Sequence, residues 1–408
     1  MAPRLRLLQY ARAIVESYWF IPAVLAVLGL GAGIALVFVD VVVGERWLGH
    51  FDWLYGSRAE GARAVLSTVA GSMITVAGVV FSITLAAVTY ASGQHGPRLL
   101  NNFVQDRGNQ AVLGVFIATF LYCLVVLRTV RSAGEAMTDG SGGAFVPHLA
   151  TLGALVLAIA SIAVLIYFVH HVTGSININR VVADIGKALI DQIRCQPEAE
   201  PLRPPPGASA VLAPCNGYIE AIDEAALVRH ACAHDLVVMV MRPLGDFVLA
   251  GRPIAECSPR CTDDEVAVEL GGSFAFSSRR KPGSDPRFAI DELVEIAARA
   301  LSPGVNDPFT AMACVDWLSA ALVEIAQRSD GDLVHRDTGG VIRLIVPGFG
   351  FDQALQRGFG RLRTYVAADA IARRYVFDSL SEIIASVSSA AHAGLLRAEF
   401  ARLESEPA

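Results

Sequence analysis

The sequence predicts an α+β membrane protein with four transmembrane helices, a cytosolic β-rich unit and a mainly helical C-terminal unit. Three observations support this prediction. Four long apolar stretches crowd into the first 173 of the 408 residues, and no comparable stretch follows. A proline-rich segment then leads to short apolar runs with the two-residue period of strands. Residues 285–408 mostly show the period of amphipathic helices.

The four apolar stretches define a transmembrane domain over residues 1–173. They are Trp19–Val43, Ala64–Ala91, Ala111–Val130 and Val146–Val172. Each can cross a hydrocarbon core of about 30 Å at about 1.5 Å per residue. Residues 1–18 are basic but lack a cleavage signature, so the first stretch is expected to be a true span.

Basic residues near the ends of the spans predict an orientation. Four spans return the chain to its starting side, and we expect both termini in the cytoplasm of a cell whose inner (plasma) membrane holds the protein. The inside segments then carry seven Lys and Arg residues near the spans against five outside. Unpaired thiols in the large C-terminal part would suit a reducing cytosol.

The second apolar stretch carries a stripe of small and hydroxylated residues on one helical face. Spacings of three and four bring together Thr68, Gly71, Thr75, Gly78, Ser82 and Thr89, with Leu85 among them. Such a stripe suits close helix packing, because small residues let backbones approach and hydroxyls bond across the contact. It also suits the lining of a pore formed by several copies, where hydroxyls contact partly hydrated ions. Both interpretations stay open.

Residues 174–210 are expected to form an amphipathic helix followed by a stiff linker. Apolar residues recur at helical spacing through Ile176–Cys195. Six prolines lie between residues 197 and 214, which is typical of an irregular connection.

A β-rich unit is predicted over residues 211–284. Its expected strands are Gly217–Ile222, Leu236–Met241 and a short one within Gly245–Gly251. The motif Gly-Asp-Phe-Val, with a glycine soon after it, resembles the hairpins of biotinyl and lipoyl domains and implies a barrel-sandwich-like scaffold. Those domains carry a cofactor on a lysine, whereas this chain has no lysine between residues 188 and 280. We therefore expect no cofactor, and a scaffold for assembly or ligand binding.

Residues 285–408 are predicted to be mainly helical, with one strand at Val341–Val346. The first helix, Phe288–Leu301, is followed by a second that begins after Asp307. Asp307 suits the N-cap of that helix, because Pro308 follows it at the first helical position. Two further helices are expected over residues 351–372 and 376–403.

The junction between the first two of these helices is a candidate pocket for an ion or small ligand. It gathers Arg299, Asn306, Asp307 and Thr310. A helix N-terminus can hold an anion. Helix capping alone also explains Asn306 and Asp307, so both interpretations stay open.

Composition and motifs argue against several function classes. A net charge of −6 without any basic run argues against nucleic-acid binding. The seven cysteines are scattered, and neither Cys257 with Cys261 nor His230 with His234 forms a zinc signature, so no metal is expected. No nucleophile elbow, P-loop or dinucleotide fingerprint occurs. We assign no catalytic residue and do not expect an enzyme.

Three long motifs resemble a bacterial family of predicted membrane proteins known as domain of unknown function 2254. They are Ser72–Thr84, Leu113–Tyr122 and Ala300–Thr310. Shorter similar segments lie at residues 96–100, 216–219 and 245–248. The resemblance covers roughly residues 15–390 and implies the architecture, but it implies no activity.

Two function classes follow from these patterns. The stripe favours a homo-oligomeric channel- or transport-like protein, whose second span lines the pathway and whose cytosolic domain regulates it. The lack of ionisable groups within the spans favours a non-conducting, membrane-anchored sensor or scaffold whose cytosolic domain binds a partner or small ligand. We prefer the first class. The expected partners are the lipid bilayer, further copies of the chain, and an ion or small ligand.

Overall fold

The computed structural model describes residues 15, 17–43, 59–95, 106–132, 145–175, 177–200, 209–260, 264–280 and 285–407. These residues divide into two compact units, one ending at Asn177 and the other beginning at Ile178. We call them the bundle and the C-terminal unit.

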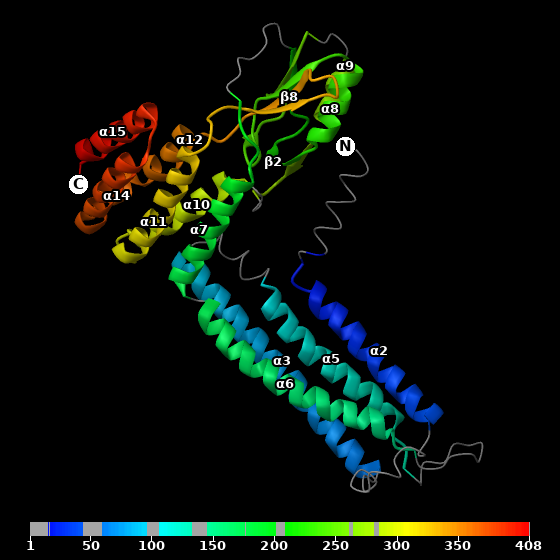
Figure 1. The fold of residues 1–408 in the computed structure, drawn as a ribbon. Coiled ribbons are helices and arrows are strands. Elements are labelled where there is room, and N and C mark those ends of the chain that lie inside the picture. The colour runs from blue at the N-terminus through cyan, green and yellow to red at the C-terminus, as the bar shows by residue number, and fades with distance from the viewer. Residues whose placement is uncertain are drawn as a thin grey trace. The chain divides into compact units, whose positions relative to one another are not determined.

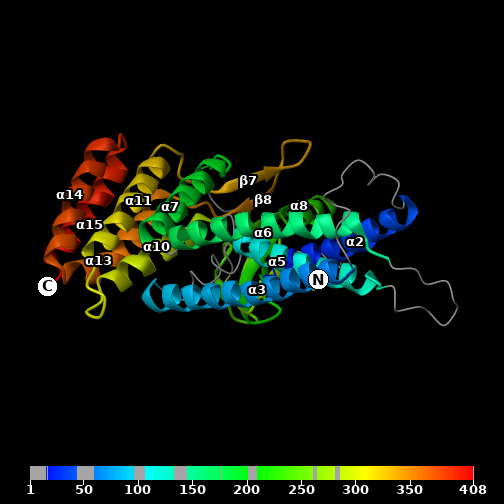
Figure 2. The ribbon, with the colours of Figure 1, turned by 90° about the horizontal axis from the view of Figure 1, so that it is seen from below.

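Long apolar helices make up the bundle (Figures 1 and 2). They are α2 (Phe20–Val43), α3 (Ala59–His95), α5 (Arg107–Thr129) and α6 (His148–Ser175). Helix α5 packs against α2, α3 and α6, so it is the most buried of the set. Each helix covers one predicted apolar stretch, and α3 extends its stretch at both ends to reach 37 residues.

Five helices among the described residues are long and apolar enough to cross a membrane. Four are those of the bundle, and the fifth is α11 (Pro308–Ala326) in the C-terminal unit. Its hydropathy of 1.5 is the lowest of the five. The sequence predicts only four spans and does not include α11. Its apolar residues are expected to pack against neighbouring helices of the cytosolic part.

Glycines allow α2 and α5 to approach closely. A Cβ on Gly29 would lie 2.6 Å from the carbonyl oxygen of Ala118, and one on Gly114 would lie 2.6 Å from Leu25 Cδ1. Helix association in a membrane depends on such packing, because lipid offers no hydrophobic driving force between helices. The tight glycine contacts between these two helices therefore fix their spacing.

The C-terminal unit begins with α7 (Ile178–Cys195), which confirms the predicted amphipathic helix. Its apolar face is buried against α10 (Pro286–Ala300) and α11 (Figure 1). Gly186 is needed at this contact, because a Cβ there would lie 2.1 Å from the ring of Trp317.

Two sheets form the β-rich part of the C-terminal unit. The larger has the order β1-β5-β3-β8-β7, with strands β1 (Ser209–Leu212), β5 (Pro253–Ser258), β3 (Val237–Val240), β8 (Ile342–Val346) and β7 (Leu333–Arg336). The smaller has the order β4-β2-β6, with strands β4 (Phe247–Val248), β2 (Gly217–Ile222) and β6 (Phe274–Ser277). Helices α8 (Glu224–Ala233) and α9 (Asp264–Gly271) share an apolar core with both sheets through Leu227 and Leu270.

Strands β2, β3, β4 and β8 confirm the four strands that the sequence predicted, of which only β2 was predicted from alternation. Helices α8 and α9 and strands β1, β5, β6 and β7 were not predicted. Strand β8 comes from the segment expected to be mainly helical, yet it runs parallel to β3 and places Leu344 beside Val238. The barrel-sandwich-like arrangement stays a prediction.

The helical part of the C-terminal unit ends the chain. After α10 and α11 it contains α12 (Phe351–Leu355), the π-helical turn η2 (Gln356–Gly360), α13 (Arg361–Ala367), α14 (Ala370–Ser386) and α15 (Ala390–Ser405). The prediction of one helix over residues 376–403 is wrong, because extended Val387 ends α14 and Ser389 caps α15. The helix predicted over residues 351–372 also ends early, because Asp369 caps α14.

Candidate functional site

Helix α3 buries one face against the other helices of the bundle. The buried positions recur at helical spacing and are Ala62, Leu66, Ala70, Met73, Ala77, Val80, Thr84 and Val88. Their contacts are with α5 and α6. The large apolar residues of α3 thus pack within the chain, and the predicted stripe lies elsewhere on the helix.

Every residue of the predicted stripe is exposed in the single chain. The stripe consists of Thr68, Gly71, Thr75, Gly78, Ser82, Leu85 and Thr89. A Cβ on Gly71 or Gly78 would meet nothing within 4 Å. Close packing inside one chain therefore does not account for the small residues of this face.

Three of the four hydroxyls of the stripe are satisfied inside α3. Thr75 Oγ1 donates to the Gly71 carbonyl at 2.8 Å, and Ser82 Oγ donates to the Gly78 carbonyl at 2.9 Å. Thr89 makes the same bond one turn back at 2.8 Å. Each hydroxyl oxygen keeps lone pairs that can accept further bonds. At Thr75, Ser82 and Thr89 the face can therefore meet lipid, a second helix or partly hydrated cations without an unsatisfied donor.

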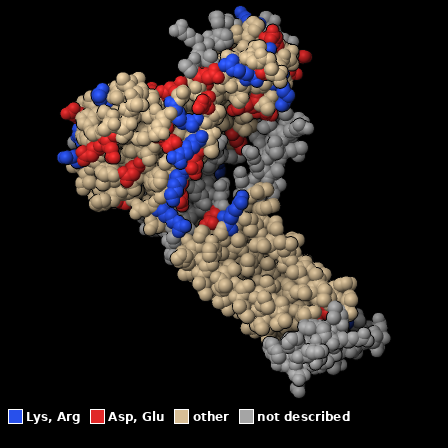
Figure 3. Space-filling model, viewed as in Figure 1, with Lys and Arg blue, Asp and Glu red and all other residues tan. Residues whose placement is uncertain are grey.

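The described charges of the bundle lie near its helix ends. Asp40 of α2 accepts hydrogen bonds from the backbone N–H groups that begin α6. Asp106 caps α5 through the Gly108 N–H at 2.7 Å and lies 2.6 Å from His171 Nε2. The visible face of the bundle in Figure 3 is almost free of charged side chains, whereas both signs gather on the C-terminal unit.

The predicted pocket between α10 and α11 contains a helix cap. Asp307 Oδ1 accepts from the Thr310 N–H at 3.1 Å, and Oδ2 accepts from the Thr310 hydroxyl at 2.6 Å. Asn306 adopts a φ of 50°, which asparagine tolerates better than most residues. Capping accounts for these contacts, and no described hydrogen bond joins the side chain of Arg299 to them. The ligand pocket at this junction stays a prediction.

A cleft that the sequence did not indicate lies within the C-terminal unit. Its volume is about 430 Å³, within the range of small-molecule sites. It is lined from α7 by Asp191, from the start of α10 by Asp285 and Arg287, and from the loop after β8 by Phe349. These elements are far apart in the sequence, so no local motif could have predicted the cleft.

Arg287 forms the charged wall of this cleft. Its side chain is 8% exposed and donates to Asp285 Oδ1 at 3.3 Å and to the Gly348 carbonyl at 2.9 Å. It also lies over the ring of Phe349, 4.7 Å from the centroid. Burial lowers the pKa of Arg287, and the charge of Asp285 opposes that shift. Arginine stays protonated in such settings, so the wall is a fixed, already paired cation.

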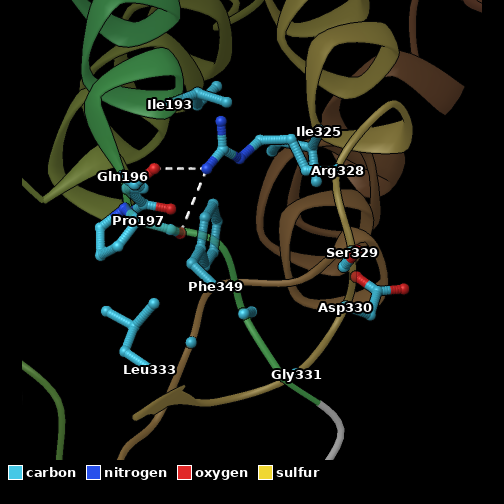
Figure 4. A pocket seen from close by; sticks show the side chains of 12 residues that line it. Ile193, Gln196, Pro197, Ile325, Arg328, Ser329, Asp330, Gly331, Leu333 and Phe349 are labelled. Atoms are coloured by element: carbon cyan, nitrogen blue, oxygen red, sulfur yellow. Dashed lines mark hydrogen bonds between the residues drawn. The ribbon is translucent and has the colours of Figure 1, made fainter. Parts of the chain in front are cut away.

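A smaller cavity of about 20 Å³ shares residues with the cleft (Figure 4). Arg328 donates there to the carbonyls of Gln196 and Pro197, just after the end of α7. Arg328 also donates to the Arg194 carbonyl in the last turn of α7 at 3.5 Å, and a basic side chain at such a carbonyl is a common C-terminal cap. The cavity has room for about one water molecule, and the contacts of Arg328 beside it are structural.

Three arginines surround Asp291 in α10. Arg357 donates to it at 2.7 and 2.8 Å, Arg361 donates at 2.7 Å, and Arg280 makes a further short contact. Burial alone would raise the pKa of Asp291, but the bonds from Arg357 and Arg280 lower it below its usual value. This network links α10 to η2 and α13 and fixes the start of the helical part.

No group of three or more His, Cys, Asp or Glu residues in the described segments could hold a metal ion. The cysteines in those segments are free thiols, and three of them are buried. Cys261 lies outside the described residues, so the Cys257 and Cys261 pair has no structural description.

Comparison with known proteins identifies relatives that match most of the chain. A family described as "Predicted membrane protein (DUF2254)" matches residues 15–382. The uncharacterized protein MT1328 of Mycobacterium tuberculosis (strain CDC 1551 / Oshkosh) is 33% identical over 384 residues, which cover 90% of this chain and 71% of the relative. The uncharacterized protein Mb1321c of Mycobacterium bovis matches to the same extent. No solved structure matches significantly. The chain therefore belongs to the DUF2254 family of predicted membrane proteins.

Proposed function

We propose that this protein is a homo-oligomeric, channel- or transport-like membrane protein in which α3 lines the pathway and the C-terminal unit regulates it. The observation that carries the proposal is the exposure of every residue of the stripe in the single chain. A membrane helix that carries glycine and hydroxyl groups on one face usually places them against a partner or a polar path. The chain's own described helices do not provide that partner.

In an oligomer of several copies around one axis, the stripe of each copy would line a shared pathway. The flanking residues Val79 and Ile83 are large, apolar and also exposed, at 52% and 45%. Contacts between copies through such flanks would turn the hydroxyls and glycine backbone toward the shared axis. Hydroxyl and carbonyl oxygens there would replace part of the hydration shell of an ion.

The proposed topology places four spans in the inner membrane and both termini in the cytoplasm. Helix α11 is then a helix of the cytosolic unit, although its length and composition would allow it to span. Its packing against α7, α10 and α14 supports this assignment, because those helices bury its apolar residues within protein.

Electrical recording tests conduction directly. The purified protein is placed in a planar bilayer under an asymmetric salt gradient, beside Ser82→Leu and Thr75→Leu. Unitary currents that both substitutions reduce are expected, and Val156→Leu, at an exposed position of α6, is the control off the stripe. If the well-folded protein gives no current, or if all variants give equal currents, the pathway along α3 is rejected.

The cleft of the C-terminal unit favours a second function. A non-conducting, membrane-anchored sensor would need a site for a small ligand, and this cleft of about 430 Å³ has apolar walls and few polar groups. Isothermal titration calorimetry with small cationic, anionic and neutral molecules tests this function. If none of these molecules binds, the sensor function loses its support.

A further inference from the structure

We propose that the cleft binds an organic cation that carries N–H groups, a protonated amine or guanidinium on an apolar body. The inference rests on the second function above and names its ligand class. It does not depend on conduction by α3.

An unpartnered carboxylate oxygen in the cleft is the first argument. The Asp285 side chain lines the cleft and is only 9% exposed. Its Oδ1 atom accepts from the Arg287 backbone N–H at 3.0 Å, which caps α10, and from Arg287 Nη1. Its Oδ2 atom is buried and has no hydrogen-bond partner in the described structure. A buried carboxylate oxygen without a donor is costly, so a donor from a bound molecule would stabilise this site.

The charge of the lining is the second argument. Asp191, Glu224 and Asp285 face a single lining arginine, Arg287. That guanidinium already donates to Asp285, to the Gly348 carbonyl and to Gln353 Oε1. Glu224 lies 3.0 Å from His335 Nε2 but remains 40% exposed. The lining thus carries three carboxylates and one guanidinium, and this excess of negative charge selects a cation.

The walls decide which kind of cation fits. They are mostly apolar and include Ile222, Leu244, Leu333, Val346 and Phe349. Hydrocarbon walls and a volume of about 430 Å³ suit an organic body better than a bare metal ion. A quaternary ammonium would leave Asp285 Oδ2 without a donor, because it has no N–H. The geometry thus selects primary or secondary ammonium and guanidinium groups.

Titration calorimetry on the full chain in lipid nanodiscs tests the ligand class, with empty nanodiscs as the blank. The probes are benzylammonium, benzyltrimethylammonium, benzyl alcohol and benzoate, which share one body and differ in charge and donors. Benzylammonium is expected to bind at least about tenfold more tightly than each of the others. If benzoate or benzyl alcohol binds as tightly as benzylammonium or more tightly, the assignment of a cation is wrong. The cleft would then still be a site for small ligands. Failure of all four to bind would reject both the inference and the ligand-binding function.

Substitutions test the location. Asp285→Asn keeps the shape and the capping oxygen but removes the charge, and it should weaken benzylammonium binding at least about tenfold. Asp378→Asn makes the same charge change on α14, where Asp378 pairs with Arg374 across one turn, and should leave binding unchanged. Unchanged binding by a folded Asp285→Asn protein would overturn the inference. If that variant does not fold, Glu224→Gln decides: several-fold weaker binding supports the site, and wild-type binding rejects it.

Discussion

Asp40 on α2 and Ala150 on α6 are joined by a hydrogen bond of 2.9 Å, from the Ala150 backbone N–H to Asp40 Oδ2. The other carboxylate oxygen accepts from the Leu149 N–H at 3.0 Å. One side chain thus satisfies two of the free N–H groups at the start of a helix 110 residues away.

Replacing Asp40 should destabilise the bundle. Asp40→Ala leaves two backbone donors of α6 unpaired, at an expected cost of about 1–3 kcal/mol in the free energy of unfolding. Denaturant unfolding of the purified protein in detergent measures the difference. Val41→Ala is the control, because Val41 is 61% exposed on the same helix. Equal stability of the two variants would show that water or lipid headgroups replace the cap without cost.

Two glycines of α2 should respond differently to the same change. Gly29→Ala places a methyl group 2.6 Å from the Ala118 carbonyl oxygen, so α2 and α5 must separate. We expect a loss of about 1–3 kcal/mol of stability from such overpacking. Gly31→Ala adds the same methyl group where nothing lies within 4 Å and should be neutral or slightly stabilising. Thermal unfolding in one detergent compares them, and a reversed order would contradict the close α2–α5 contact.

The stripe on α3 should govern association rather than folding of the single chain. Gly78→Leu fills open space in the chain, so its thermal stability as a protomer should not change. The same change should reduce the mass of the detergent-solubilised complex, measured by light scattering after size exclusion. Val156→Leu, at an exposed position of α6, should alter neither property. An unchanged mass for Gly78→Leu would mean that the stripe makes no contact between copies.

Asp291 should give the C-terminal unit an acid-sensitive component of stability. The pKa of Asp291 is lowered in the folded state, so its stabilising effect is complete at neutral pH and is lost as the pH falls below about 4. Asp291→Asn removes this effect at every pH and leaves three arginines without their anion, at a cost of about 3–5 kcal/mol near pH 7.

Melting temperatures measured from about pH 3 to 7 test this expectation. The wild-type protein should lose stability on acidification more steeply than Asp291→Asn. The exposed Asp378→Asn variant should follow the wild-type curve. Parallel curves for the wild type and Asp291→Asn would contradict a lowered pKa.

Local patterns predicted the features that depend on local chemistry. Helical spacing placed Thr75 and Ser82 on one face of α3, and the alternation of residues 217–222 predicted β2. Asp307 was predicted as the N-cap of α11 because side-chain type and the following proline suffice for that motif.

Features made by distant parts of the chain could not be predicted in this way. Asp285 and Asp191 meet in one cleft only because α7 packs beside α10. Hydropathy alone did not assign α11, because apolar residues look alike whether protein or lipid buries them. Helix α8 was missed because its ten residues are short for a clear helical period.

The parallel pairing of Val238 with Leu344 has a consequence for biosynthesis. Strand β3 leaves the ribosome long before β8, so one edge of the growing sheet lacks its neighbour until residues 342–346 have been made. An unpaired strand edge is a template for aggregation. A chaperone that shields β3 during this interval would raise the yield of folded chains, and fragments that stop before residue 342 would be poorly soluble.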